Sequence, residues 1–153
     1  MPATTTATQP SHGKAVLREL SPLHRELRHA IPDTYRGFGE LHKAAFAAGA
    51  LDAKTKELIA LAIGVVEGCD GCIASHAQAA ARAGANRQEA AEAIGVTFLM
   101  KGGPATIYGP RAYDAFCEFA EAQETGESPR LTWLCRTLHP LSKEIRYVPS
   151  RPL

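Results

Sequence analysis

The chain has 153 residues, a formal net charge of +1 and a hydrophobic fraction of 45%. This length suits one compact domain whose core needs no disulfide support, and the balanced charge disfavours a nucleic-acid or anionic-membrane surface. No stretch has the roughly 18 uninterrupted apolar residues of a membrane span, so we expect a soluble, cytoplasmic protein with no membrane partner.

Helical periodicity dominates the sequence, and no stretch shows the alternation of a half-buried strand. We therefore predict an all-α fold, a compact bundle of about six helices. Ser21 followed by Pro22 predicts the cap and first residue of a short helix that ends before Pro32. Asp33 predicts the cap of the next helix, which stops at Gly49.

Two further helices have clearer start signals. Asp52 predicts the cap of a helix that runs to about Val66. Asn86, with Glu89 three residues later, resembles a capping box for a helix that ends at Gly102.

The helix over 58–66, LIALAIGVV, is apolar on all sides, which predicts a central helix covered all round. The alanine-rich residues 74–85 predict close packing against it, because small side chains let helix axes approach. A last helix is predicted from Pro104 to about Gly126. Pro110 is expected to kink or interrupt it, since proline lacks an amide proton and clashes with the preceding turn.

Composition divides the chain into three parts. Residues 1–13 are rich in Thr, Ser, Pro and Gly and predict a flexible lead. Residues 14–125 form the helical domain. Residues 126–153 predict an irregular C-terminal extension, either loosely held or docked on a partner subunit by a strip of apolar side chains: Trp133, Leu134 and Leu138.

The segment EGCDGCIASH contains the strongest chemical signal. Cys69 and Cys72 form a C-x-x-C pair, and His76 follows four residues after the second cysteine. Gly68 breaks the preceding helix and helical composition then resumes, so the cysteines are predicted in the first turn of a helix. Unpaired backbone amides and the helix dipole favour a thiolate there.

A helix start alone does not activate a thiol. Moving a free cysteine from a pKa of about 8.5 to about 7 needs roughly 2 kcal/mol, whereas a helix end supplies about 0.3 to 1. Asp70 opposes the thiolate, so another group must take the proton. His76 lies one turn beyond Cys72 on the same helix face and is the predicted base. If the two helices form an antiparallel hairpin, Glu57 is level with His76 and can hold its ring.

The combined spacing of Glu57, Cys69, Cys72 and His76 resembles the alkylhydroperoxidase D-like branch of the carboxymuconolactone decarboxylase superfamily. The similarity extends from about residue 38 to 121 and includes KGGPATIYGPRAYDAF near its end. It implies an all-helical homo-oligomer, a trimer or a hexamer, that reduces hydroperoxides. We expect no metal and no bound organic cofactor.

The resemblance also implies a role for each site residue. Cys72 attacks the peroxide and becomes a sulfenic acid, Cys69 resolves it to a disulfide, and His76 with Glu57 relays protons. A dithiol reductant, a lipoyl-type protein in some members, resets the pair. Gly71 departs from the family, which commonly places an aromatic residue or histidine before the second cysteine.

Other interpretations of the motif stay open at this point. The cysteines can form a static disulfide, or bind zinc together with His76 and one of two glutamates, Glu57 or Glu67. The same fold can host a carboxymuconolactone-type decarboxylase or a redox-sensing module without enzyme activity. Two cysteines, Cys117 and Cys135, have no chemical partner nearby in the sequence. Three aromatic residues are predicted to lie in the core or at a subunit contact: Tyr108, Tyr113 and Phe116.

Overall fold

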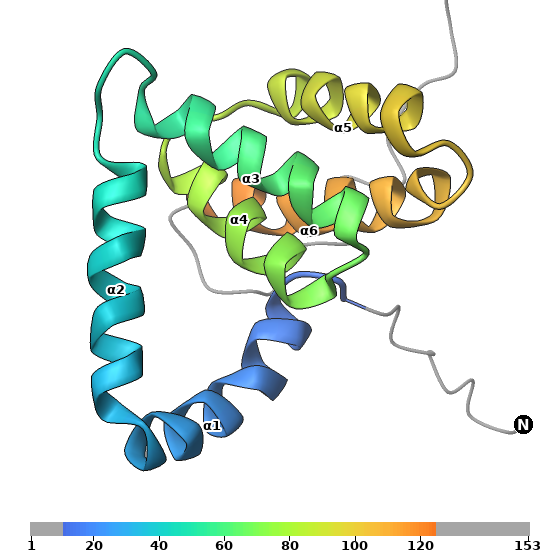
Figure 1. Cartoon of the computed structure of the whole chain (residues 1–153). Helices are drawn as coiled ribbons and strands as arrows, with labels where there is room; N and C mark the ends of the chain where they lie inside the picture. Colours follow the sequence, from blue (N-terminus) through green and yellow to red (C-terminus); the bar gives the residue numbers. More distant parts are fainter. Residues whose placement is uncertain (1–10, 125–153) are drawn as a thin grey trace, which may run out of the picture.

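The computed structural model describes residues 11–124, and this part of the chain is helical, with no strand. The helices are α1 (Lys14–Ala30), α2 (Pro32–Phe46), α3 (Ala53–Glu67), α4 (Asp70–Arg82), α5 (Arg87–Lys101) and α6 (Ala105–Glu124) (Figure 1). The predicted all-α bundle of about six helices is confirmed. The predicted extension, with its Trp133, Leu134 and Leu138, lies outside the described residues, as does most of the predicted lead. None of the described helices is long and apolar enough to cross a membrane.

Helices α3 to α6 pack together and contain the hydrophobic core, whose largest fully buried side chains are Leu61, Val65, Ile73 and Phe116. Small residues bring α3 and α4 together, as predicted. A methyl group added at Gly64 of α3 would lie 3.3 Å from the Ile73 backbone nitrogen of α4. The close approach of these two helices places the cysteine motif against the core.

The prediction that α3 is covered on every side is wrong for the described chain. Ile59 is 46% exposed and Ile63 is 56% exposed. Together with Val96 and Met100 of α5, they line an apolar groove of about 720 Å³. The apolar composition of α3 therefore exceeds what the neighbouring helices of one chain can bury.

Local capping signals gave the starts of α3 and α5 correctly. The Asp52 carboxylate accepts a hydrogen bond from the Thr55 backbone amide at 2.7 Å. Asn86 and Glu89 form a reciprocal capping box. Both predicted caps are confirmed, and α5 ends before Gly102 as expected.

Helix α6 passes through Pro110 without ending, so the helix is not interrupted there. Pro110 is exposed, and so is Thr106, whose carbonyl would receive the missing amide bond. Water can satisfy that carbonyl, which makes the proline tolerable on this side of the helix.

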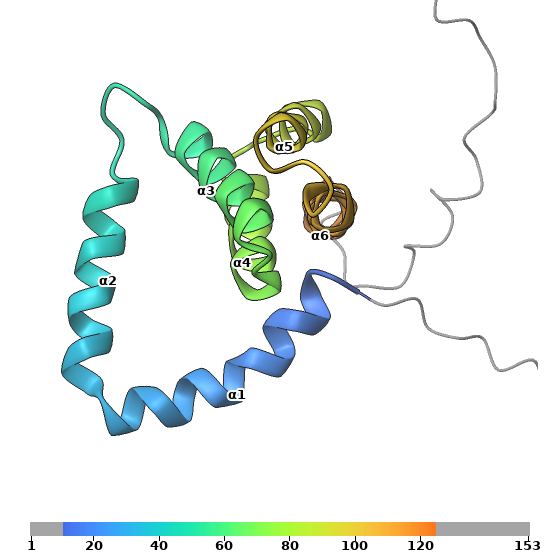
Figure 2. The same cartoon turned by 45° about the vertical axis from the view of Figure 1, so that its right-hand side comes forward.

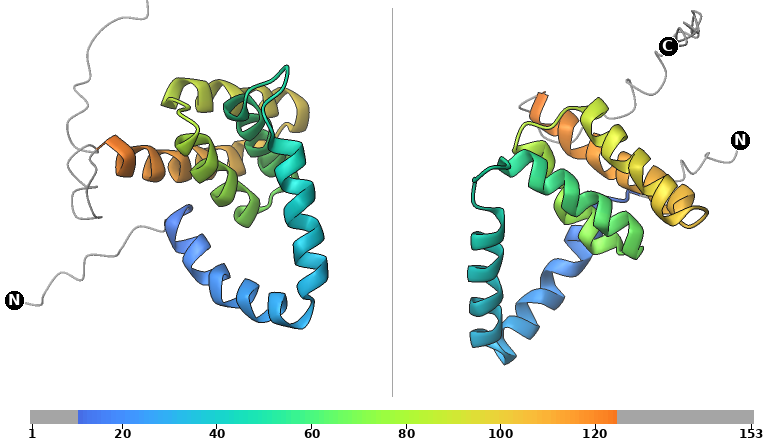
Figure 3. Two further views of the ribbon diagram at one scale, coloured as in Figure 1. Left: turned by 90° about the vertical axis from the view of Figure 1, so that its left-hand side faces the viewer. Right: turned by 45° about the horizontal axis from the view of Figure 1, so that its top comes forward.

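The two N-terminal helices form an arm that stands away from the bundle (Figures 2 and 3). Neither α1 nor α2 contains a buried residue. Their predicted starts are wrong, because α1 begins at Lys14 with Pro22 in its interior, and Ile31 rather than Asp33 occupies the cap position of α2. Helix α2 also ends at Phe46, before Gly49.

The start of α1 is capped by a side chain from the other end of the domain. The Glu118 carboxylate of α6 accepts hydrogen bonds from the backbone amides of His12 and Lys14, both at 3.0 Å, and from the Ser11 hydroxyl at 2.8 Å. His12 Nδ1 also lies 2.9 Å from Asp114 Oδ2. A local bond adds to this cap, since the Ser11 hydroxyl also accepts from the Ala15 backbone amide at 3.0 Å. Glu118 itself lies more than 100 positions away, so no pattern near residue 14 specifies it as a partner.

Candidate redox site

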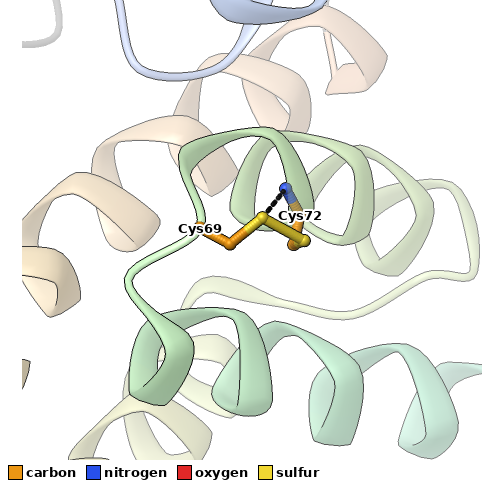
Figure 4. The surroundings of a disulfide bond; sticks show 2 residues. All are labelled: Cys69 and Cys72. Carbon is orange, nitrogen blue, oxygen red and sulfur yellow. Dashed lines mark hydrogen bonds between the residues drawn. A yellow bond between two sulfur atoms is a disulfide. The ribbon is translucent and has the colours of Figure 1, made fainter.

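The two cysteines lie at the start of α4, as the sequence predicted, and are joined by a disulfide (Figure 4). Their Cα atoms are 5.2 Å apart. Cys69 is the cap residue of α4, and its Sγ accepts a hydrogen bond from the Cys72 backbone amide at 3.2 Å. Cys72 is exposed, whereas Cys69 is half-buried. The sulfur of Cys69 thus takes the place of the capping oxygen that usually satisfies an amide at a helix start.

A tight turn between α3 and α4 sets the position of the pair. Gly68 adopts the left-handed conformation, with φ of 65°, and the Cys69 amide donates to the Gly64 carbonyl at 3.1 Å. A methyl group at Gly68 would also come within 3.0 Å of the Tyr108 ring. Glycine is therefore needed here both for backbone conformation and for space.

Glu57 and His76 meet across the interface between α3 and α4. His76 Nδ1 lies 2.8 Å from Glu57 Oε2, and both side chains are largely enclosed, with 22% and 10% of their surface exposed. Glu57 as an ionised acceptor directs the proton to Nδ1 and leaves Nε2 outside this bond. The hairpin geometry that the sequence required is thus present, with the imidazole one helical turn beyond Cys72.

Two residues of α6 complete the surroundings of the pair, and sequence reasoning missed this arrangement. Arg111 lies 3.4 Å from the Asp70 carboxylate and 5.2 Å from the centre of the Tyr108 ring. The guanidinium thus places a positive charge beside the carboxylate next to Cys69. Asp70 and Arg111 are 41 residues apart, so only the fold brings them together.

The arm contributes two side chains to this region. The Phe46 ring of α2 stacks on the His76 imidazole, and Leu20 of α1 lies against Gly71, where an added methyl group would approach its Cδ1 to 2.9 Å. Leu20 thus takes up space that a larger residue at position 71 would need. The resembled family commonly has an aromatic residue or histidine at this position.

The other sequence candidates lie apart from the pair. Burial raises the pKa of the Cys117 thiol, which contacts Arg87 and Tyr113. Phe116 is fully buried in the core, as assigned, and Cys135 lies outside the described residues. Within residues 11–124, no group of three or more His, Cys, Asp and Glu side chains is placed to hold a metal ion.

The fold and this site define a class of protein: an all-α domain with a cysteine pair at a helix start and a carboxylate–imidazole pair beside it. Residues 32–116 match the Carboxymuconolactone decarboxylase family. The chain belongs to this family.

Several relatives share most of the domain. An uncharacterised protein of Cupriavidus necator is 37% identical over 103 residues, which cover 67% of this chain and 91% of that protein. A carboxymuconolactone decarboxylase family protein from Legionella pneumophila is 39% identical, with a TM-score of 0.67 over 69% of this chain and 95% of that one. A family protein from Thermotoga maritima, a candidate for a part in an antioxidative response, is 30% identical, with a TM-score of 0.64 over 75% and 97% of the two chains.

Proposed function

We propose that the protein is a thiol-dependent peroxidase of the alkyl hydroperoxide reductase type. The observation that carries this proposal is the Glu57–His76 hydrogen bond one turn beyond a cysteine pair at a helix start. The exposed Cys72 is the sulfur that a peroxide can reach, and the helix start favours its thiolate.

The reaction begins with reduced cysteines. His76 takes the proton of Cys72, and the thiolate attacks the terminal oxygen of the hydroperoxide. The O–O bond breaks, the alcohol leaves with a proton, and Cys72 becomes a sulfenic acid. The Cys69 thiolate then attacks the sulfur of Cys72, which forms the disulfide and releases water. Glu57 orients the imidazole and stabilises its charged form.

A dithiol reductant closes the cycle. Its thiolate attacks one sulfur of the Cys69–Cys72 disulfide and forms a mixed disulfide. Its second thiol then attacks the reductant's own sulfur in that bond and releases the protein thiol, so the cysteine pair gains two electrons. A lipoyl-type dithiol fits this chemistry because its own two thiols close into a ring on oxidation. The reaction needs no metal and no bound organic cofactor.

Peroxide turnover with matched cysteine variants tests the proposal. The assay follows loss of an alkyl hydroperoxide with dihydrolipoamide as reductant. Cys72→Ser and Cys69→Ser should each reduce turnover to background, whereas Cys117→Ser should match wild type. Full turnover by Cys72→Ser would remove the assignment.

Mass spectrometry after one equivalent of peroxide assigns the two sulfurs. Wild type should gain a disulfide, and Cys69→Ser should accumulate a sulfenic acid on Cys72, trapped with a sulfenic-acid reagent. A sulfenic acid that forms on Cys69 in the Cys72→Ser variant at the wild-type rate would reverse the two roles.

The family to which the chain belongs supports a second candidate, a carboxymuconolactone-type decarboxylase. The cysteine pair argues against it because decarboxylation of a lactone acid needs no change in thiol oxidation state. Decarboxylation of carboxymuconolactone that survives alkylation of both cysteines would favour this candidate over the peroxidase.

We also propose that the protein works as a homo-oligomer, a trimer or a hexamer. The groove between α3 and α5 leaves Ile59 and Ile63 about half exposed, and Val96 and Met100 of α5 are 61% and 73% exposed. A second copy of the chain would cover such apolar surface. Light scattering should give a mass of three or six chains for wild type and a smaller mass for Ile63→Asp. A monomeric wild type would contradict this assembly.

A further inference from the structure

We propose that Phe46 is a positioning residue of the redox site and fixes the plane of the His76 ring. The inference rests on the proposed role of His76 as the base for Cys72. It assigns to the arm a part in the chemistry that the sequence motif does not contain.

The Phe46 ring stacks with two imidazoles. Its centroid is 5.6 Å from that of His76, with an angle of 17° between the planes, and 4.6 Å from that of His42, with an angle of 21°. These near-parallel, offset arrangements fall within the range in which aromatic rings attract each other. Phe46 therefore packs against His42 of its own helix as well as against His76.

Phe46 is also the point at which α2 reaches the bundle. Within α2, only Tyr35 and Phe46 are half-buried, and the other side chains are exposed. Lys56 of α3 holds the chain on both sides of this residue, because its Nζ donates to the carbonyl oxygens of Ala45 at 2.9 Å and Ala47 at 2.5 Å. The end of α2 is thus anchored where the aromatic ring meets the site.

The stack supplies a constraint that the glutamate cannot. The bond to Glu57 restrains Nδ1, whereas the plane of the ring is set by rotation about the Cβ–Cγ bond of His76. A flat apolar ring stacked on the imidazole limits this rotation. With both constraints, Nε2 has a defined direction, which proton transfer requires.

The test compares three variants of the reduced full-length protein. Phe46→Leu removes the ring but keeps an apolar side chain, and Phe46→Tyr keeps the ring. Phe38→Leu makes the same ring deletion at a position of α2 that is 65% exposed. Because α2 has no buried residue, we expect all three to fold.

Two measurements report on the ring rather than on general stability. Ring-current shifts of the His76 carbon-bound protons should be lost in Phe46→Leu and kept in the other two variants. The rate at which iodoacetamide alkylates Cys72 at neutral pH should fall about tenfold in Phe46→Leu, with its pH profile moved to higher pH. Phe46→Tyr and Phe38→Leu should both remain close to wild type.

Unchanged proton shifts and an unchanged alkylation profile in Phe46→Leu would overturn the inference. An equal loss in Phe46→Tyr would overturn it too, since that variant retains the stack. Neither measurement needs a peroxide. If the wild-type protein consumes no hydroperoxide, the proposed function is wrong, but the role of Phe46 is still decided by these two measurements.

Discussion

The bundle α3–α6 and the arm α1–α2 differ in what holds their helices in place. Among residues 11–124, the buried core side chains all lie in the bundle or in the loop between α4 and α5, whereas neither arm helix has a buried residue. The bundle helices α3 and α5 carry side-chain caps, whereas no side chain of the cap residue itself closes α1 or α2. The bundle is thus fixed by a continuous core and by local signals.

The arm is fixed instead at a few separate points. Glu118 holds its start, Leu20 meets Gly71 near the cysteines, and Lys56 with the Phe46 stack holds its end. The Glu118, Leu20 and Phe46 contacts join residues that are distant in sequence, whereas Lys56 reaches back only 9 and 11 positions to Ala47 and Ala45. The redox residues therefore lie in the bundle, while the arm adjusts their surroundings.

The largest expected difference is in the free energy of unfolding, when the same Phe→Ala substitution is made in the bundle and in the arm. Phe116→Ala in the bundle should lower the free energy of unfolding by about 3 to 5 kcal/mol, because a fully buried ring is replaced by a cavity. Phe38→Ala in the arm should change it by less than about 0.5 kcal/mol when the chain is dissociated. Urea unfolding at low protein concentration measures both. Equal losses would mean that the arm belongs to the core after all.

A smaller effect is expected at the joint between arm and bundle. Glu118→Gln replaces one carboxylate oxygen by an amide donor, which faces backbone amides that are themselves donors. The free energy of unfolding should fall by about 1 to 2 kcal/mol. The change should appear first as faster hydrogen exchange at the backbone amides of His12 and Lys14, which bond to Glu118 directly.

Glu124→Gln is the matched control for this substitution. Glu124 also lies on α6, but its partner Arg87 belongs to the bundle, and its side chain is 63% exposed. Glu124→Gln should leave the rate of amide hydrogen exchange in α1 unchanged. Accelerated exchange throughout the bundle in Glu118→Gln would show that the arm and the bundle unfold as one unit.

The same contrast explains how much the sequence could predict. The caps of α3 and α5 are local patterns, and the level placement of Glu57 and His76 follows from helix geometry once a hairpin is assumed. These features were predicted correctly. The prediction that Pro22 opens a helix was wrong. Proline is common at the first position of a helix, but here it lies inside α1.

Contacts between distant helices could not be predicted in this way. The cap of α1 comes from Glu118, the partner of Asp70 is Arg111, and the ring on His76 belongs to Phe46. Nothing near residues 14, 70 or 76 in the sequence specifies these partners. The exposed side of α3 was missed for a related reason, since apolar composition does not reveal which chain will cover it.

The smallest expected effect separates a true helix cap from an acidic residue that only resembles one. Asn86→Ala should lower the free energy of unfolding by about 1 kcal/mol, because the Glu89 backbone amide loses its acceptor at the start of α5. Asp33→Ala should leave stability almost unchanged, because Asp33 lies inside the first turn of α2 and forms an exposed ion pair with Arg36. Thermal unfolding of both variants against wild type measures the difference. A loss at Asp33 as large as that at Asn86 would show that α2 is stabilised by the same local signals as the bundle helices, and the distinction between the two regions would then rest on burial alone.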